Sequence, residues 1–226
     1  MGEKVRYDTM TQPVFATVIL DVDSTVSGVE GIDWLAARRG PDVARNVAEL
    51  TDRAMRGEIA LESVYGARLA LVRPDREGLE ALGHEYVARM APGCADAIAR
   101  MRGRGLEVKL ISGGLRMAIA PLAARLGLRV DDLSAVDVTL DDDGQFVSFD
   151  EASPLTTATG KQTVVESLSV RRPVLAVGDG STDLAMRPAV DSFVCFTGFQ
   201  RREAIVRHAD ASVATFDELL RIVFPK

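Results

Sequence analysis

Short apolar runs rich in branched residues recur along this chain, and each is followed by a cluster of polar or small residues. The runs are Val14–Leu20, Val108–Ile111, Val174–Val177 and Phe193–Phe196. They are continuous instead of alternating, as expected for strands that are covered on both faces. Helical patterns accompany them, at Cys94–Arg104, Leu115–Leu126, Lys161–Leu168 and Asp217–Val223. This alternation of strands and helices predicts an α/β fold with a doubly wound, Rossmann-like parallel sheet.

One stretch interrupts the alternation, because residues 28–91 contain helical patterns and no strand run. The expected helices are Asp33–Arg39, Pro41–Met55, Leu61–Val72 and Asp75–Met90. We therefore expect a small helical cap domain, residues 28–91, inserted into a core domain of residues 1–27 and 92–226. Within the core, Val136–Asp150 alternates on both sides of "DDDG", which predicts a β-hairpin near residues 136–150 with a solvated acidic turn.

The composition excludes several classes of protein. The 226 residues carry a net charge of −6, which argues against a broad nucleic-acid surface. No apolar run is long enough to cross a bilayer. The two cysteines, Cys94 and Cys195, lack the spacing of a metal site or a disulfide framework and are expected as buried thiols in a reducing compartment. We expect a cytoplasmic protein, a monomer or homodimer, without nucleic-acid or membrane partners.

The polar clusters that follow the strands form the candidate site, because ligands bind beyond the carboxyl ends of parallel strands. Asp21 and Asp23 are two residues apart, so both side chains point the same way while Val22 faces the core. Asp179 and Asp183 follow the third run. Converging carboxylates repel one another unless a cation joins them, and oxygen ligands without His or Cys favour Mg²⁺.

The remaining groups at this edge suit a phosphate. Gly113 and Gly114 let backbone N–H groups approach an anion, at what we expect to be a helix N-terminus. Ser112 offers a hydroxyl, and Lys161 offers a positive charge. Each of these residues alone has an ordinary structural interpretation, and it is their joint occurrence that points to a site. Together they supply the nucleophile, cations and acid that phosphoryl transfer requires.

Four motifs carry a resemblance to a known family. "DVDST", the serine of "ISGG", the lysine of "TGK" and "GDGSTD" are similar to the motifs of the haloacid-dehalogenase-like (HAD) phosphohydrolases. Within that superfamily the chain resembles the phosphoserine phosphatase family over nearly its whole length. The stretches that carry this likeness are "DVDSTVSGVEGID", "TDRAMRGE" with "RLALVRP", "LISGGLR" and "GDGSTDL". The resemblance implies a Mg²⁺-dependent phosphomonoester hydrolase acting on a small phosphorylated metabolite.

The resemblance also implies a role for each residue. Asp21 would attack phosphorus and form an aspartyl-phosphate, and Asp23 would act as acid and then as base. Mg²⁺ would be bound by the Asp21 carboxylate, the Asp23 backbone carbonyl and Asp179. Asp183 would position that metal site from just outside it. The phosphoryl oxygens would be held by Ser112, Gly113 and Lys161.

Substrate recognition is implied for two charged residues of the helical insert. Glu30 would bind the amino group of phosphoserine and Arg68 its carboxylate, since opposite charges suit a zwitterion. From the residues alone, Glu30 is equally a helix-start acid and Arg68 one of several arginines on its helix. Further substrate-contacting positions implied by the resemblance are Met55, Gly114, Thr182 and Arg202. The alternatives are a phosphatase for phosphothreonine or a sugar phosphate, and a receiver-like phosphoaspartate module, which needs neither a cap nor the acid Asp23.

Overall fold

The computed structural model describes residues 12–55, 58–59 and 61–226. Six strands form one parallel sheet in the order β3-β2-β1-β6-β7-β8. Their bounds are β1 Thr17–Leu20, β2 Glu107–Leu115, β3 Leu133–Val136, β6 Val174–Gly178, β7 Ser192–Phe196 and β8 Ala211–Val213. The predicted doubly wound α/β fold is therefore confirmed.

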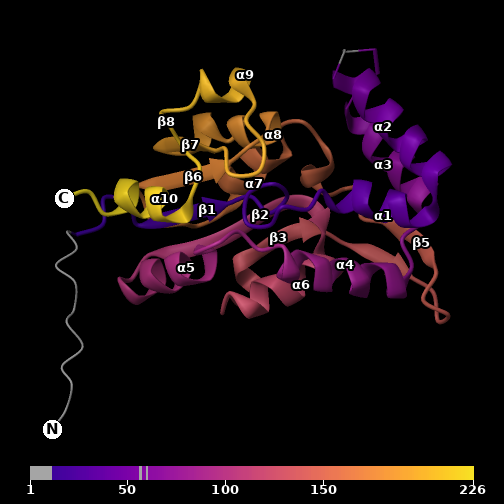
Figure 1. Ribbon diagram of the computed structural model, residues 1–226, viewed down its shortest axis with the longest axis horizontal. Helices are drawn as coiled ribbons and strands as arrows, with labels where there is room; N and C mark the ends of the chain where they lie inside the picture. Colours follow the sequence, from indigo (N-terminus) through magenta and orange to yellow (C-terminus); the bar gives the residue numbers. More distant parts are fainter. Residues whose placement is uncertain (1–11, 56–57, 60) are drawn as a thin grey trace, which may run out of the picture.

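The chain runs from β1 to β2 and β3 on one side and later crosses to β6, β7 and β8 on the other side of β1, so the strand order reverses between β1 and β6. Right-handed crossovers in such a sheet place helices on both faces. The helices outside the stretch between β1 and α5 are α5 Cys94–Gly103, α6 Arg116–Arg125, α7 Gly160–Ser167, α8 Ser181–Leu184, α9 Glu203–Val206 and α10 Phe216–Val223. Helices α5 and α6 pack on β2, α6 also packs on β3, and α8 packs on β6, in the arrangement that Figure 1 shows. Short 3₁₀ turns lie at Val130–Asp132, Pro154–Thr156 and Arg187–Ala189.

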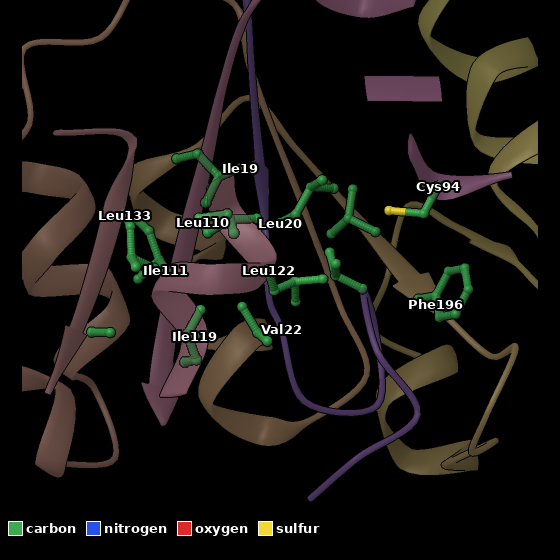
Figure 2. Packing of buried hydrophobic residues seen from close by; sticks show 14 of the residues in the cluster. Ile19, Leu20, Val22, Cys94, Leu110, Ile111, Ile119, Leu122, Leu133 and Phe196 are labelled. Atoms are coloured by element: carbon green, nitrogen blue, oxygen red, sulfur yellow. The ribbon is translucent and has the colours of Figure 1, made fainter. Parts of the chain in front are cut away.

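The core lies along β1, where every residue is buried. Figure 2 shows Val22 packed in the same apolar cluster as Ile119 and Leu122 of α6. Val22 is 0% exposed, as the alternation of Asp21, Val22 and Asp23 predicts. Burial of this one side chain therefore turns its two acidic neighbours toward the opposite side.

The sequence prediction was incomplete at the sheet edges. The edge strands β3 and β8 were not predicted, and the first strand starts at Thr17 and not at Val14, which is 46% exposed. The helix expected to follow Gly113 and Gly114 is present and starts one residue later than predicted. Both glycines belong to an irregular end of β2, where the register with β3 shifts, and α6 begins only at Arg116.

The helical insert contains α1 Gly31–Arg39, α2 Pro41–Met55, α3 Leu61–Val72 and α4 Arg76–Ala88. Helices α1, α2 and α3 pack on one another, and Figure 1 shows them at one end of the sheet. In contrast, α4 packs along α6. A Cβ atom on Gly83 would lie 3.2 Å from the carbonyl oxygen of Ala118, so glycine permits this close approach.

The predicted hairpin is present as β4 Val138–Leu140 and β5 Phe146–Phe149, and its three turn aspartates are exposed. It contacts the junction of α3 and α4. The Arg76 N–H donates to the Gly144 carbonyl at 2.8 Å, and Arg73 donates to the Phe146 carbonyl at 3.1 Å. The hairpin therefore supports the helical insert.

Two further predictions concern the whole chain. Cys94 and Cys195 are both buried and free, as expected. Among the helices that the structure describes, none is both long and apolar enough to cross a membrane.

Candidate active site

The ends of β1, β2 and β6 open on a cavity of about 730 Å³ whose other wall comes from α1, α2 and α3. Twelve predicted site residues line it: Asp21, Asp23, Glu30, Arg68, Ser112, Gly113, Gly114, Lys161, Asp179, Thr182, Asp183 and Arg202. The remaining one, Met55, ends α2, and its side chain lies outside the described part of the structure. Asp21 and Arg202, which are 181 positions apart in the sequence, thus border one space.

Three carboxylates form a buried cluster on the sheet side of the cavity. One oxygen each of Asp21, Asp179 and Asp183 lies within 4.8 Å of the others. Asp21 directly follows β1, and its N–H donates to the Val177 carbonyl of β6 at 2.9 Å. This bond extends the sheet by one residue and places Asp21 beside Asp179, which directly follows β6.

Lys161 balances part of this negative charge. Its Nζ lies 2.5 Å from Asp21 Oδ1 and 2.5 Å from Asp183 Oδ1, and the side chain is buried. Burial acts to lower the pKa of Lys161, but the charges of Asp183 and Asp21 outweigh it and raise that pKa. The ammonium group therefore stays charged at neutral pH.

The acidic cluster fits a divalent cation. Burial raises the pKa of Asp21 well above its usual range, and the Asp183 charge adds to that rise while Lys161 opposes it. Asp179 Oδ2 is buried, and the Arg202 guanidinium contacts this same oxygen. The three carboxylates of the cluster thus face two cationic side chains, and carboxylate oxygens are the ligands that bind hard metal ions.

Asp23 lies beside the cluster and has different partners. Its Oδ1 accepts a hydrogen bond of 2.5 Å from the Tyr86 hydroxyl, and its Oδ2 accepts one of 3.2 Å from the Gly31 N–H. Burial and then the charge of Glu30 raise the pKa of Asp23 to about 7, although the Tyr86 bond lowers it. A carboxyl group with this pKa can exchange protons near neutral pH.

The irregular end of β2 presents the predicted phosphate-binding groups. Ser112 Oγ accepts the Gly114 N–H at 2.9 Å. The Gly113 carbonyl accepts the Tyr65 hydroxyl of α3 at 2.7 Å. Ser112 is 1% exposed and is one of the residues that line the cavity.

The insert contributes charges of both signs to the opposite wall. Arg68 pairs with Asp33 at 2.9 Å, while its Nε is buried and has no hydrogen-bond partner among the described residues. Glu30 Oε1 accepts the Ser24 hydroxyl at 2.8 Å and lies 3.7 Å from Arg202 Nη2. The cavity therefore offers an anionic group and an unsatisfied cationic donor to a ligand.

The residues at this site that were not predicted from the sequence include Asp33, Tyr65 and Tyr86. Asp33 and Tyr65 line the cavity, and Tyr86 is a fully buried neighbour of Asp23. Their polar partners are 35, 48 and 63 residues away in the sequence. No local motif signals such contacts, and a tyrosine on an apolar helix face usually indicates only packing.

The family model of haloacid dehalogenase-like hydrolases matches residues 18–187. The chain belongs to this family. Among curated proteins, it is 36% identical over 208 residues to the chloroplastic phosphoserine phosphatase of Arabidopsis thaliana, covering 90% of this chain and 70% of that protein. It is 34% identical over 206 residues to human phosphoserine phosphatase, covering 90% and 91% of the two chains.

A solved structure has the same fold. It is described as a phospho-aspartyl intermediate analogue of phosphoserine phosphatase, and it superposes with a TM-score of 0.76 at 23% identity. The match covers 94% of this chain and 99% of that one. The predicted resemblance to phosphoserine phosphatases of the HAD superfamily is confirmed by these relatives.

Proposed function

We propose that this protein is a Mg²⁺-dependent phosphatase that hydrolyses L-phosphoserine to serine and inorganic phosphate. The observation that carries the proposal is the buried cluster of Asp21, Asp179 and Asp183 with Lys161, which faces Glu30 and Arg68 across one cavity. The phosphoserine phosphatases that the chain resembles support the choice of substrate.

In the first step, a carboxylate oxygen of Asp21 attacks phosphorus and the bond from phosphorus to the serine oxygen breaks. The protonated Asp23 carboxyl group gives its proton to the departing serine oxygen, and an aspartyl-phosphate remains. In the second step, the Asp23 carboxylate takes a proton from water as that water attacks phosphorus. The bond from phosphorus to Asp21 then breaks and releases phosphate. An Asp23 pKa of about 7 suits both roles.

The charges around Asp21 support this chemistry. Lys161 and the Ser112 hydroxyl would hold phosphoryl oxygens, and the Gly113 N–H would add a third donor. Magnesium held by the Asp21 carboxylate, the Asp23 carbonyl and Asp179 would supply the positive charge that offsets the approaching phosphate. Asp183 Oδ2 accepts the N–H groups of Asp179 and Gly180, so it would keep the metal-binding turn in place.

Residues 28–91 would act as a cap over the cavity. Arg68 Nε would bind the substrate carboxylate, and Glu30 the amino group. Thr182 and Arg202 would contact the phosphate side of the substrate. Because α4 packs along α6, we propose that it anchors the cap while α1, α2 and α3 border the substrate. The two buried free cysteines support a cytoplasmic location.

A phosphate-release assay with MgCl₂ tests the proposal. The panel contains phosphoserine, phosphothreonine, a sugar phosphate and an aryl phosphate. Phosphoserine is expected among the best substrates, and its absence from them would refute the substrate assignment. Asp21→Asn is expected to abolish turnover without loss of the folded state in circular dichroism. Substantial magnesium-dependent turnover by that variant would show that Asp21 is not the nucleophile. In the wild type, a stable phosphoaspartate without turnover would favour the receiver-like alternative.

A further inference from the structure

Tyr65 connects the helical insert to the end of β2. Its hydroxyl, on α3, donates a hydrogen bond of 2.7 Å to the Gly113 carbonyl. The ring packs separately against Phe149 of the hairpin, with 5.5 Å between the ring centroids. Burial raises the pKa of Tyr65 above its usual value, so the hydroxyl keeps its proton and remains a donor. Ring and hydroxyl thus have different partners on two different elements.

The Gly113 carbonyl and the Gly114 N–H belong to one planar peptide unit. Its N–H donates to Ser112 Oγ at 2.9 Å. The Tyr65 hydroxyl, this peptide and the Ser112 hydroxyl therefore form a continuous chain of hydrogen bonds. Because a donor on the carbonyl polarises the peptide, the N–H bond to Ser112 is strengthened.

The Gly114 bond sets the direction of the Ser112 hydroxyl. Ser112 Oγ uses a lone pair to accept the Gly114 N–H, and no described residue accepts the Ser112 O–H. Ser112 is almost fully buried except where it borders the cavity. The O–H is thus free to donate to a ligand in the cavity.

We propose that Tyr65 is a positioning residue, which fixes the Gly113–Gly114 peptide and thereby aims the Ser112 hydroxyl at the phosphoryl group of the substrate. This inference rests on the proposed phosphatase function. It also makes the phosphate-binding hydroxyl depend on the placement of α3, so that the insert and the phosphate site are coupled through one tyrosine.

The test is Tyr65→Phe, which removes the hydroxyl and leaves the ring for Phe149. Binding of inorganic phosphate to the magnesium-loaded protein is measured by calorimetry in the wild type, in Tyr65→Phe, in Ser112→Ala and in the double variant. Loss of one neutral hydrogen bond in this chain should weaken phosphate binding by about three- to tenfold. In the Ser112→Ala background, Tyr65→Phe should have no further effect, because the group that it positions is gone.

Thr51→Val is the matched control. Thr51 lines the same cavity from α2, but its hydroxyl bonds only to the Val47 carbonyl of its own helix. This variant should keep wild-type phosphate affinity. The proposal is overturned by an equal loss in Thr51→Val, by no loss in Tyr65→Phe, or by equal losses from Tyr65→Phe with and without Ser112.

Kinetics on an aryl phosphate separate this inference from the substrate assignment. Tyr65→Phe should lower kcat/KM for phosphoserine and for the aryl phosphate by the same factor, because both carry the phosphoryl group. A loss confined to phosphoserine would make Tyr65 a ligand of the serine moiety and refute the positioning role. Failure of the wild type on phosphoserine would refute the substrate assignment and leave the phosphate-binding test unaffected.

Discussion

Gly31→Ala is expected to destabilise the protein, because Tyr86 occupies the space that a side chain at position 31 needs. A Cβ atom on Gly31 would lie 2.2 Å from Tyr86 Oη, 3.2 Å from Tyr86 Cζ and 3.4 Å from Leu82 Cδ2. Favourable contacts between heavy atoms lie near about 3.5 Å, so the methyl group or the tyrosine must move by about 1 Å. Tyr86 is fully buried and has little room for such a movement.

The expected cost is about 1–3 kcal/mol of unfolding free energy, as is typical of overpacking in a core. Displacement of Tyr86 would also disturb its 2.5 Å hydrogen bond to Asp23, and bonds to charged groups contribute about 1.5–3 kcal/mol. Helix propensity acts in the other direction by at most about 1 kcal/mol, the preference for alanine over glycine in a helix interior, because Gly31 is the first residue of α1. A net loss of stability would therefore identify the clash.

Urea unfolding of four proteins measures this effect: the wild type, Gly31→Ala, Tyr86→Phe and the double variant. Tyr86→Phe removes the Oη atom, so the nearest atom of the ring at position 86 is then Cζ, which lies 3.2 Å from the new methyl group. The cost of Gly31→Ala should fall below about 1 kcal/mol in that background, which is a non-additive result.

Gly103→Ala is the matched control, since Gly103 ends α5 and no atom lies within 4 Å of its Cβ position. Its stability should equal or slightly exceed that of the wild type. The reasoning is refuted if Gly31→Ala is as harmless as Gly103→Ala, or if it costs the same with and without the Tyr86 hydroxyl.

Three further predictions concern the ligand, the metal and pH. Arg68→Ala should lower kcat/KM for phosphoserine by about ten- to hundredfold and spare an aryl phosphate, and equal losses on both would remove Arg68 from substrate recognition. Removal of divalent metal by a chelator should abolish phosphate release, with recovery on addition of Mg²⁺, and Asp179→Asn should weaken magnesium binding in a calorimetric titration. The pKa of Asp210 is lowered by the Phe193 N–H and then by Arg187, so the folded value lies below the unfolded value of about 3.9. The contribution of Asp210 to the unfolding free energy is present above about pH 4 and is lost as pH falls through the folded pKa. In Asp210→Asn, the unfolding free energy should therefore fall less steeply as the pH is lowered below about 4.

The central strands could be predicted because their signal is local. Val18, Ile19 and Leu20 are buried on both faces of β1, and such strands are continuous apolar runs in the sequence. The alternation at Asp21, Val22 and Asp23 likewise follows from the two-residue period of a strand. The edge strands β3 and β8 are short and are interrupted by Ser134 and Ser212, so neither is a continuous apolar run.

The acidic and glycine-rich turns were located correctly, but their partners were only partly predictable. Lys161 was expected to bind phosphate, and in the structure it bonds to the carboxylates of Asp21 and Asp183. Gly113 and Gly114 were expected at a helix start, and they lie in the irregular strand end that directly precedes α6. The residue types at this edge therefore indicate the chemistry, whereas the bonds among them depend on how the turns pack.

By itself, the sequence determined the sheet, the insert and the strand ends that carry Asp21, Ser112 and Asp179. The spacing of apolar residues and the residue types are properties of neighbouring positions, so they can be read from the sequence. Only the tertiary structure decided that Tyr65 bonds to the Gly113 carbonyl and Tyr86 to Asp23. Each of these contacts joins a helix of the insert to a strand end 48 or 63 residues away. Such a pair depends on the packing of two elements, and no period within either element encodes it.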